Sequence, residues 1–81
     1  MYLTYILYSD TVGKYYIGST GDDIHERLRK HNSMHKGFTG RSPDWKLVYT
    51  EVFPDLSAAR KRELQIKKWK SRKMIEQLIH G

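Results

Sequence analysis

The stretch TYILYSDTVGKYYIGST, residues 4–20, decides how the fold begins. Its two halves are rich in aromatic and β-branched residues, which favour strands. Between them, Ser9 to Lys14 is polar and contains Gly13, which can adopt the positive φ that tight turns need. The stretch therefore predicts a β-hairpin, with one strand over 2–8 and a return strand over 15–19.

The turn also determines which residues of the hairpin face each other. If Ser9 pairs with Lys14, then Tyr5 pairs with Gly18. Because side chains alternate between the two faces of a strand, Tyr5 and Tyr16 then share a face as diagonal neighbours. Gly18 has no side chain, which leaves room for another group to approach the backbone beside Tyr5.

Turn and capping residues divide the rest of the chain into further elements. One of the two residues Asp22 and Asp23 can cap the first helix, and Ser71 can cap the last. The elements expected after the hairpin are a helix over about 23–32, a loop over 35–44, a strand over 45–53, a helix over about 57–70 and a helix after residue 71. Residues 1–81 therefore predict a single α+β domain, a small three-stranded antiparallel sheet flanked by three helices in the order β-β-α-β-α-α.

The first two predicted helices carry polar residues on or beside their buried faces. In the first helix, four residues at helical spacing share one face: Ile24, Arg27, Leu28 and His31. A charge beside the stripe that packs on a sheet is awkward unless it has a function. In the second helix, the buried side is defined by Ala58, Ala59, Ile66 and Trp69. Glu63 lies at the margin of this side. In the third, we expect the apolar face to consist of Met74, Ile75, Leu78 and Ile79.

The charge of the chain points to a phosphate-rich partner. Fifteen Lys and Arg against nine Asp and Glu give a net charge of +6. Glu63 is the only acid in a basic run that holds eight of the fifteen cations: Arg60, Lys61, Arg62, Lys67, Lys68, Lys70, Arg72 and Lys73. Such a run is typical of a nucleic-acid-binding surface, although a solvated helix face can carry the same charge.

Several other classes of protein fit the sequence less well. The chain has no cysteine, which excludes a disulfide framework and a thiolate zinc site. His31 and His35 would share a helix face but have no third ligand with them, so zinc is not favoured. No stretch approaches the ~20 apolar residues of a membrane helix, and the first residues do not resemble a signal peptide. We expect a cytoplasmic protein without a membrane partner.

The order of these motifs resembles the GIY-YIG nuclease superfamily. Tyr5 matches the tyrosine of the first motif, and Tyr16-Ile17-Gly18 matches the second. The arginine, histidine and glutamate that follow in the family are matched here by Arg27, His31 and Glu63. The first motif departs from the family, because Leu3 and Thr4 stand where glycine and isoleucine are usual. The similarity covers almost the whole chain and is greatest to short stand-alone bacterial members; the chain is also similar to the N-terminal catalytic domain of the excinuclease members.

The resemblance implies hydrolysis of phosphodiester bonds in DNA with one divalent metal, Mg²⁺ or Mn²⁺. The catalytic residues that it implies are Tyr5, Tyr16, Arg27, His31 and Glu63. Glu63 would bind the metal, since Mg²⁺ is commonly held by one carboxylate with water and phosphate. Arg27 would present its fork of donors to a phosphate. Tyr16 is the first candidate for the general base, and Tyr5 and His31 are alternatives that the residues alone leave open.

The expected contacts to nucleic acid follow from the second motif and the basic residues. We expect these contacts at Gly18, Lys30, Arg60, Lys61, Lys67, Lys68 and Lys70. Selection of the substrate by DNA structure, as in repair or recombination, fits so small a domain. A partner protein that supplies targeting fits it equally.

Each of these assignments has a structural alternative. The alternatives are that Tyr16 is sheet surface, that Arg27 pairs with Asp23, that His31 complements the helix C-terminus and that Glu63 pairs with Lys67. Tyr8 and Tyr15 are expected to serve packing. For the whole chain, the main alternative is a nucleic-acid-binding module of the same fold without turnover. A protein–protein adaptor is the third.

Overall fold

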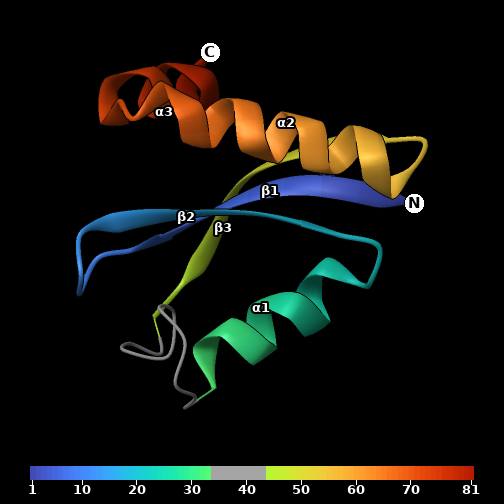
Figure 1. The fold of residues 1–81 in the computed structure, drawn as a ribbon. Coiled ribbons are helices and arrows are strands. Elements are labelled where there is room, and N and C mark those ends of the chain that lie inside the picture. Colours follow the sequence, from blue (N-terminus) through green and yellow to red (C-terminus); the bar gives the residue numbers. More distant parts are fainter. Residues whose placement is uncertain (34–43) are drawn as a thin grey trace.

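A computed structural model describes residues 1–33 and 44–81 (Figure 1). The described elements are β1 (Tyr2–Ser9), β2 (Lys14–Thr20), α1 (Ile24–Asn32), β3 (Lys46–Phe53), α2 (Leu56–Trp69) and α3 (Arg72–His80). They confirm the predicted order β-β-α-β-α-α. Most of the loop predicted over 35–44, and with it His35, lies outside the described residues.

The three strands form one antiparallel sheet with the order β2-β1-β3. Ser9 pairs with Lys14 and Tyr5 pairs with Gly18, as the turn predicted. Gly13 has a φ of +65°, so the turn does use the conformational freedom of glycine. Because β1 is the central strand, β2 and β3 are the two edges of the sheet.

Helices cover both faces of the sheet: α1 lies on one side, and α2 and α3 lie on the other (Figure 1). The central strand is therefore buried on both faces, and its residues alternate between two cores. Tyr5 and Leu7 pack with Trp45, Ile24 and Leu28 on the α1 side. The other core, on the side of α2 and α3, is built from Ile6, Ile17, Ile66 and Ile75.

A side-chain cap begins each of the three described helices. Asp23 accepts a hydrogen bond from the backbone N–H of His25, and Ser71 accepts one from that of Met74. Asp55 caps α2 by accepting from the N–H of Ala58. Lys70 then adopts the left-handed conformation, with a φ of 48°, and this change of direction separates α2 from α3.

Most of the predicted helix faces are confirmed, with one correction in α3. Ala59 and Ile66 are buried in α2, and Ile75 is buried in α3. Met74, however, is 42% exposed. Successive helix residues are rotated by about 100°, so Met74 lies at the margin of the face that Ile75 centres.

Arg62 lies within the buried arc of α2 and has two partners there. Its Nε donates to Glu51 on β3 at 3.1 Å, and its guanidinium lies 5.6 Å from the centre of the Trp69 ring. The Arg62 charge is therefore satisfied inside the fold. Within the described residues, no helix is both long and apolar enough to cross a membrane.

Candidate active site

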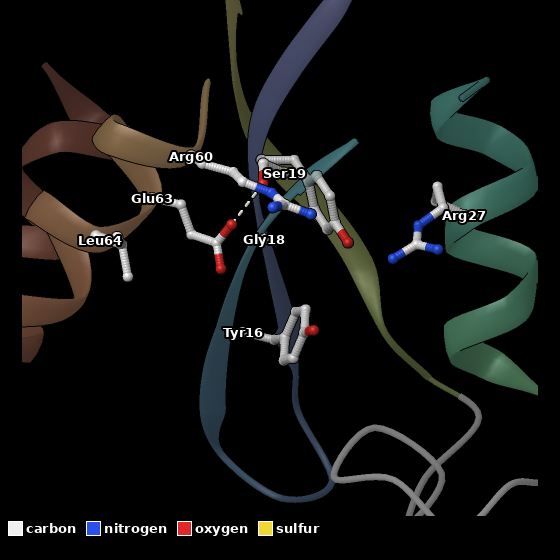
Figure 2. Close-up of a pocket in the computed structure, with 8 residues that line it drawn as sticks. Tyr16, Gly18, Ser19, Arg27, Arg60, Glu63 and Leu64 are labelled. Carbon is white, nitrogen blue, oxygen red and sulfur yellow. Dashed lines mark hydrogen bonds between the residues drawn. The ribbon is translucent and has the colours of Figure 1, made fainter. Parts of the chain in front are cut away.

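A pocket at the edge strand β2 brings together side chains from both faces of the sheet (Figure 2). Its lining consists of Tyr5, Tyr16, Gly18, Ser19, Arg27, Arg60, Glu63 and Leu64. Figure 2 shows Arg27 extending from α1 and Glu63 from α2, with Tyr16 between the two helices. Because β2 is an edge, side chains on opposite faces can meet around it. Four of the five predicted catalytic residues thus line one pocket.

Gly18 and Tyr5 determine the inner wall of this pocket. Tyr5 is fully buried, and its ring lies directly over the backbone of Gly18. A Cβ at position 18 would lie 2.6 Å from the Tyr5 hydroxyl oxygen and 2.7 Å from Cζ. The space beside Gly18 is therefore filled by the Tyr5 ring, whereas the sequence had suggested an opening for another group.

His31 is the predicted catalytic residue that lies behind the pocket wall. It is buried, and its Nε2 lies 2.9 Å from the Tyr5 hydroxyl oxygen, within hydrogen-bond distance. Its ring also packs against Tyr16, with 4.7 Å between ring centres, and the Tyr5 and Tyr16 rings are 6.4 Å apart. His31 thus contacts both tyrosines and holds Tyr5 through its hydroxyl.

Burial changes the acid–base chemistry of Tyr5. Loss of solvent raises the pKa of the Tyr5 phenol above its usual value, and hydrogen bonding and charge from Arg27 offset part of this shift. The Tyr5 phenol is therefore neutral at ordinary pH. It is better suited to hold a neighbour by a hydrogen bond than to take a proton, which argues against Tyr5 as the general base.

Arg27 faces the pocket with an unused hydrogen-bond donor. Hydrogen bonding with Tyr5 raises the pKa of Arg27, which therefore keeps its charge. Its buried Nε has no hydrogen-bond partner within the described parts of the chain. None of the ion pairs between described residues joins Arg27 to Asp23, the structural alternative for this arginine. A buried, unsatisfied donor on a cation is suited to an anionic ligand.

Glu63 is held at both of its carboxylate oxygens. Oε1 accepts a hydrogen bond from Ser19 Oγ at 2.5 Å, and Oε2 pairs with Lys67 Nζ at 2.6 Å. The ion pair with Lys67 that the sequence allowed is therefore present. Only 17% of the Glu63 side chain is exposed, yet the residue lines the pocket. The carboxylate is fixed in place and still faces the open space.

The donor set fits a hard divalent cation held chiefly by water and phosphate. Each carboxylate oxygen has a second lone pair, so Glu63 can contact a cation while Ser19 still donates to it. The described residues contain no group of three or more His, Cys, Asp or Glu side chains that could hold a metal. A single carboxylate with open positions suits Mg²⁺ or Mn²⁺ better than it suits a structural zinc.

The residues predicted to bind nucleic acid are distributed over several surfaces. Gly18 and Arg60 line the pocket with Glu63. Lys30 lines a shallow hollow beside Arg27 and His31. The remaining four, all from the basic run, are exposed: Lys61, Lys67, Lys68 and Lys70.

Arg72, in contrast, serves the packing of α3 on the hairpin. It donates to the Gly13 carbonyl at 2.8 Å and to the Tyr8 hydroxyl at 3.2 Å. Its guanidinium also lies over the rings of Tyr8 and Tyr15, which contact each other at 4.7 Å between centres. The prediction that these two tyrosines serve packing agrees with these contacts.

Sequence reasoning missed Ser19 and Leu64 in the pocket lining. Ser19 follows Gly18 on β2, so strand alternation places it on the face opposite Tyr16 and Gly18, toward α2. That alternation was a readable signal. Which residue of α2 would meet Ser19 depended on how the helix docks, and this could not be read from the spacing.

Comparison with known proteins gives a family match but no individual relative. No curated protein and no solved structure matches the chain significantly. The family model for the GIY-YIG catalytic domain, however, matches residues 1–76. Since this match includes the sheet, the pocket and nearly all of the three helices, the chain belongs to the GIY-YIG family and has its nuclease-type fold.

Proposed function

We propose that this protein is an endonuclease that hydrolyses phosphodiester bonds in DNA with the help of Mg²⁺ or Mn²⁺. The observation that supports this most is the pocket at β2, where Glu63 from α2 faces Arg27 from α1 and Tyr16 from the sheet. A carboxylate, a fixed cation and a phenol around one opening are the groups that phosphodiester hydrolysis needs.

Glu63 would hold the cation in this pocket. Ser19 fixes one of its oxygens, and the side chain is mostly buried, so the carboxylate is oriented before any ligand arrives. A bound divalent cation would polarise the phosphate and stabilise the departing oxygen. Lys67 forms an ion pair with Glu63 and so places a further positive charge at this end of the pocket.

Arg27 would bind the phosphate from the opposite side of β2. Its planar fork of N–H groups matches phosphate oxygens, and its buried Nε donor lacks a partner within the described residues. As negative charge develops on the phosphate, these donors are already in place, and such preorganised contacts stabilise the transition state strongly.

Tyr16 would take the proton from the attacking water. Tyr16 lines the same pocket as Arg27 and Glu63, so its hydroxyl shares one opening with the groups that would hold the phosphate and the cation. Tyr5, whose pKa is raised by burial, stays protonated and fixes His31 at 2.9 Å. In this proposal, Tyr5 and His31 keep Tyr16 and the pocket wall in position.

The proposed substrate is DNA recognised by its backbone and its structure. The cations around the pocket suit contacts to phosphate, and such contacts carry no sequence information directly. We therefore propose a role in DNA repair or recombination in the cytoplasm, with a partner protein that directs this single domain, residues 1–81, to its target.

One observation favours a second candidate, a nucleic-acid-binding module of the same fold without turnover. Both oxygens of Glu63 already have protein partners, Ser19 and Lys67. If the ion pair with Lys67 persisted in the presence of divalent cations, the Lys67 charge would weaken the attraction of Glu63 for a divalent cation. Binding through the cations would then remain without hydrolysis.

A cleavage assay separates the two candidates. The substrates are supercoiled plasmid, branched DNA and single-stranded DNA, each with Mg²⁺, Mn²⁺ or EDTA. We expect metal-dependent cleavage by the parent protein, and a rate reduced by a factor of about 10² or more in Arg27→Ala. Salt-dependent binding of all three substrates without any cleavage would instead identify the protein as a binding module.

A further inference from the structure

A second pocket lies beside the first, along the same edge strand. Its lining comes from the hairpin turn and β2, from the C-terminal half of α2 and from the start of α3, and it includes Lys14, Ile17, Ile66, Lys67, Lys70 and Ile75. The first pocket uses Tyr16, Gly18 and Ser19 of β2, so the two follow one another along the strand. The ion pair between Glu63 and Lys67 joins them at their boundary.

The second pocket combines an apolar floor with a basic rim. Ile17, Ile66 and Ile75, all buried members of the core, lie at its base. Lys14, Lys67 and Lys70 line it with their charged side chains. This pairing suits a nucleotide, which has anionic phosphate oxygens on one side and an apolar sugar or base surface on the other.

The cations of the basic run that lie on α2 extend from two different sides of this helix. Lys67 lies in the row of α2 that follows β2, one turn beyond Glu63. Lys68 is rotated about 100° from Lys67, and Lys61 lies seven residues before Lys68 on the same side. Neither Lys61 nor Lys68 lines either pocket. The basic run therefore has one side directed along β2 and another directed away from it.

We propose that the second pocket binds a nucleotide of the same strand several positions from the cleaved phosphodiester, with its phosphate held by Lys14 and Lys70. This inference rests on the proposed function, because it requires a nucleic acid strand in the first pocket. The strand would follow β2 from Ser19 toward Gly13, a distance of about 20 Å at 3.3 Å per residue. That length accommodates several nucleotides, which rise about 3.4 Å each in a duplex strand.

Lys14 supplies a positive charge to the second pocket from outside the basic run, because it lies on β2. It stands at the start of β2, and it lines the second pocket together with Lys70, which follows the end of α2. A phosphate between them would be approached by cations from two different elements. Two-sided contact of this kind distinguishes a built binding site from a helix surface that attracts nucleic acid without a fixed register.

The test compares two double variants that each remove two positive charges. The first is Lys14→Ala with Lys70→Gly, since glycine suits the left-handed backbone at position 70. The matched control is Lys61→Ala with Lys68→Ala. DNA binding is measured by fluorescence anisotropy on a labelled branched duplex in EDTA, at several salt concentrations, while plasmid nicking by the parent is measured in Mg²⁺ and Mn²⁺.

We expect the first pair to lower the slope of log K against log salt by about 2, one for each lost phosphate contact. The control pair should lower it by less than about 1. A further variant, Lys14→Arg with Lys70→Arg, keeps both positive charges and should restore the salt dependence to that of the parent. Thermal melting shows whether each variant is folded. Equal losses in the two pairs, or failure of the arginine variant to restore the slope, would overturn the second pocket alone. If the parent protein neither binds nor nicks DNA, the proposed function itself fails.

Discussion

The contact between Gly18 and Tyr5 shows at the residue scale why this site needs a glycine in its strand. The backbone of Gly18 is not in the left-handed region, so conformational freedom is not the reason for glycine here. The reason is space, because the buried Tyr5 ring occupies the volume that a Cβ would take. Tyr5 in turn holds His31, which packs against Tyr16. One missing side chain therefore determines the positions of three aromatic residues.

Gly18→Ala should destabilise the protein and reduce its activity together. The added Cβ would lie 2.6 Å from the Tyr5 hydroxyl oxygen, so the fully buried Tyr5 ring would have to shift and its contact with His31 would be disturbed. We expect a loss of roughly 1–3 kcal/mol in the free energy of unfolding, the usual cost of overpacking. Urea denaturation measures it.

Gly21→Ala is the matched control for this substitution. Its Cβ would lie 2.7 Å from the Tyr2 ring, but Tyr2 is only half-buried and can turn away. The control should therefore cost less than Gly18→Ala. If both variants were equally stable, the claim that position 18 needs a glycine to make room for the Tyr5 ring would be wrong.

The docking of α2 on β1 illustrates the scale of the element. The buried hydroxyl of Thr4 donates to the carbonyl of Ala59 at 2.6 Å, between the central strand and the first turns of α2. This is the position at which the family usually has isoleucine. The contact sets how far α2 lies from the sheet, and α2 carries Glu63. Thr4, which departs from the family motif, thus helps to position α2, the helix that carries the candidate metal ligand.

Thr4→Val should cost about 1 kcal/mol, because the volume is kept and one buried hydrogen bond is lost. For a domain of this size, that loss lowers the melting temperature by roughly 4–8 °C. Thr4→Ser retains the hydroxyl and is the control for the hydrogen bond. Calorimetry of both variants is the measurement, and a valine variant as stable as the parent would remove this role for Thr4.

The sequence predicted the elements and the hairpin register well, because both depend on local chemistry. The turn at Gly13 and the caps at Asp23 and Ser71 act within a few residues. It could not predict the contact between Ser19 and Glu63, which are 44 residues apart and meet only after α2 docks. Helical spacing did place His31 on the face of the first helix that packs on the sheet, but its contact with the Tyr5 hydroxyl could not be read from the sequence, since it depends on how α1 lies on the sheet.

The arrangement of the whole molecule places the site where two layers meet. Helices cover both faces of a three-stranded sheet, and the pocket lies around the edge strand between them. The net charge of +6 is therefore presented beside an opening that contains both a carboxylate and a buried arginine. A positively charged domain attracts a polyanion from a distance, and in the proposed function the pocket would then bind a single phosphate.

Stability of the whole protein should fall in alkaline solution. The pKa of Tyr5 is raised above its usual value in the folded state, mainly by burial, so the unfolded chain loses this proton first. The stability linked to Tyr5 is fully present below the unfolded pKa near 10 and is lost as pH rises through the folded pKa. Between these two values, the free energy of unfolding should fall by up to about 1.4 kcal/mol per pH unit.

Urea denaturation between about pH 8 and pH 11, on either side of the unfolded pKa, measures this dependence, and Tyr5→Phe serves as the comparison. The variant is less stable at neutral pH, since it loses the contact with His31. Its stability should nevertheless decline less steeply above about pH 10 than that of the parent. Parallel curves for the two proteins would show that Tyr5 titrates alike in the folded and unfolded states.

The central claim is that Glu63 supports metal-dependent hydrolysis at the edge of the sheet, and Glu63→Gln tests it most directly. Glutamine retains the shape and can still accept from Ser19, so the fold should remain intact by circular dichroism and thermal melting. Plasmid nicking in Mg²⁺ and Mn²⁺ is the measurement. The account predicts that the parent nicks DNA only with a divalent cation and that the folded variant loses at least about a hundredfold in rate. Nicking by Glu63→Gln at the parent rate would contradict it.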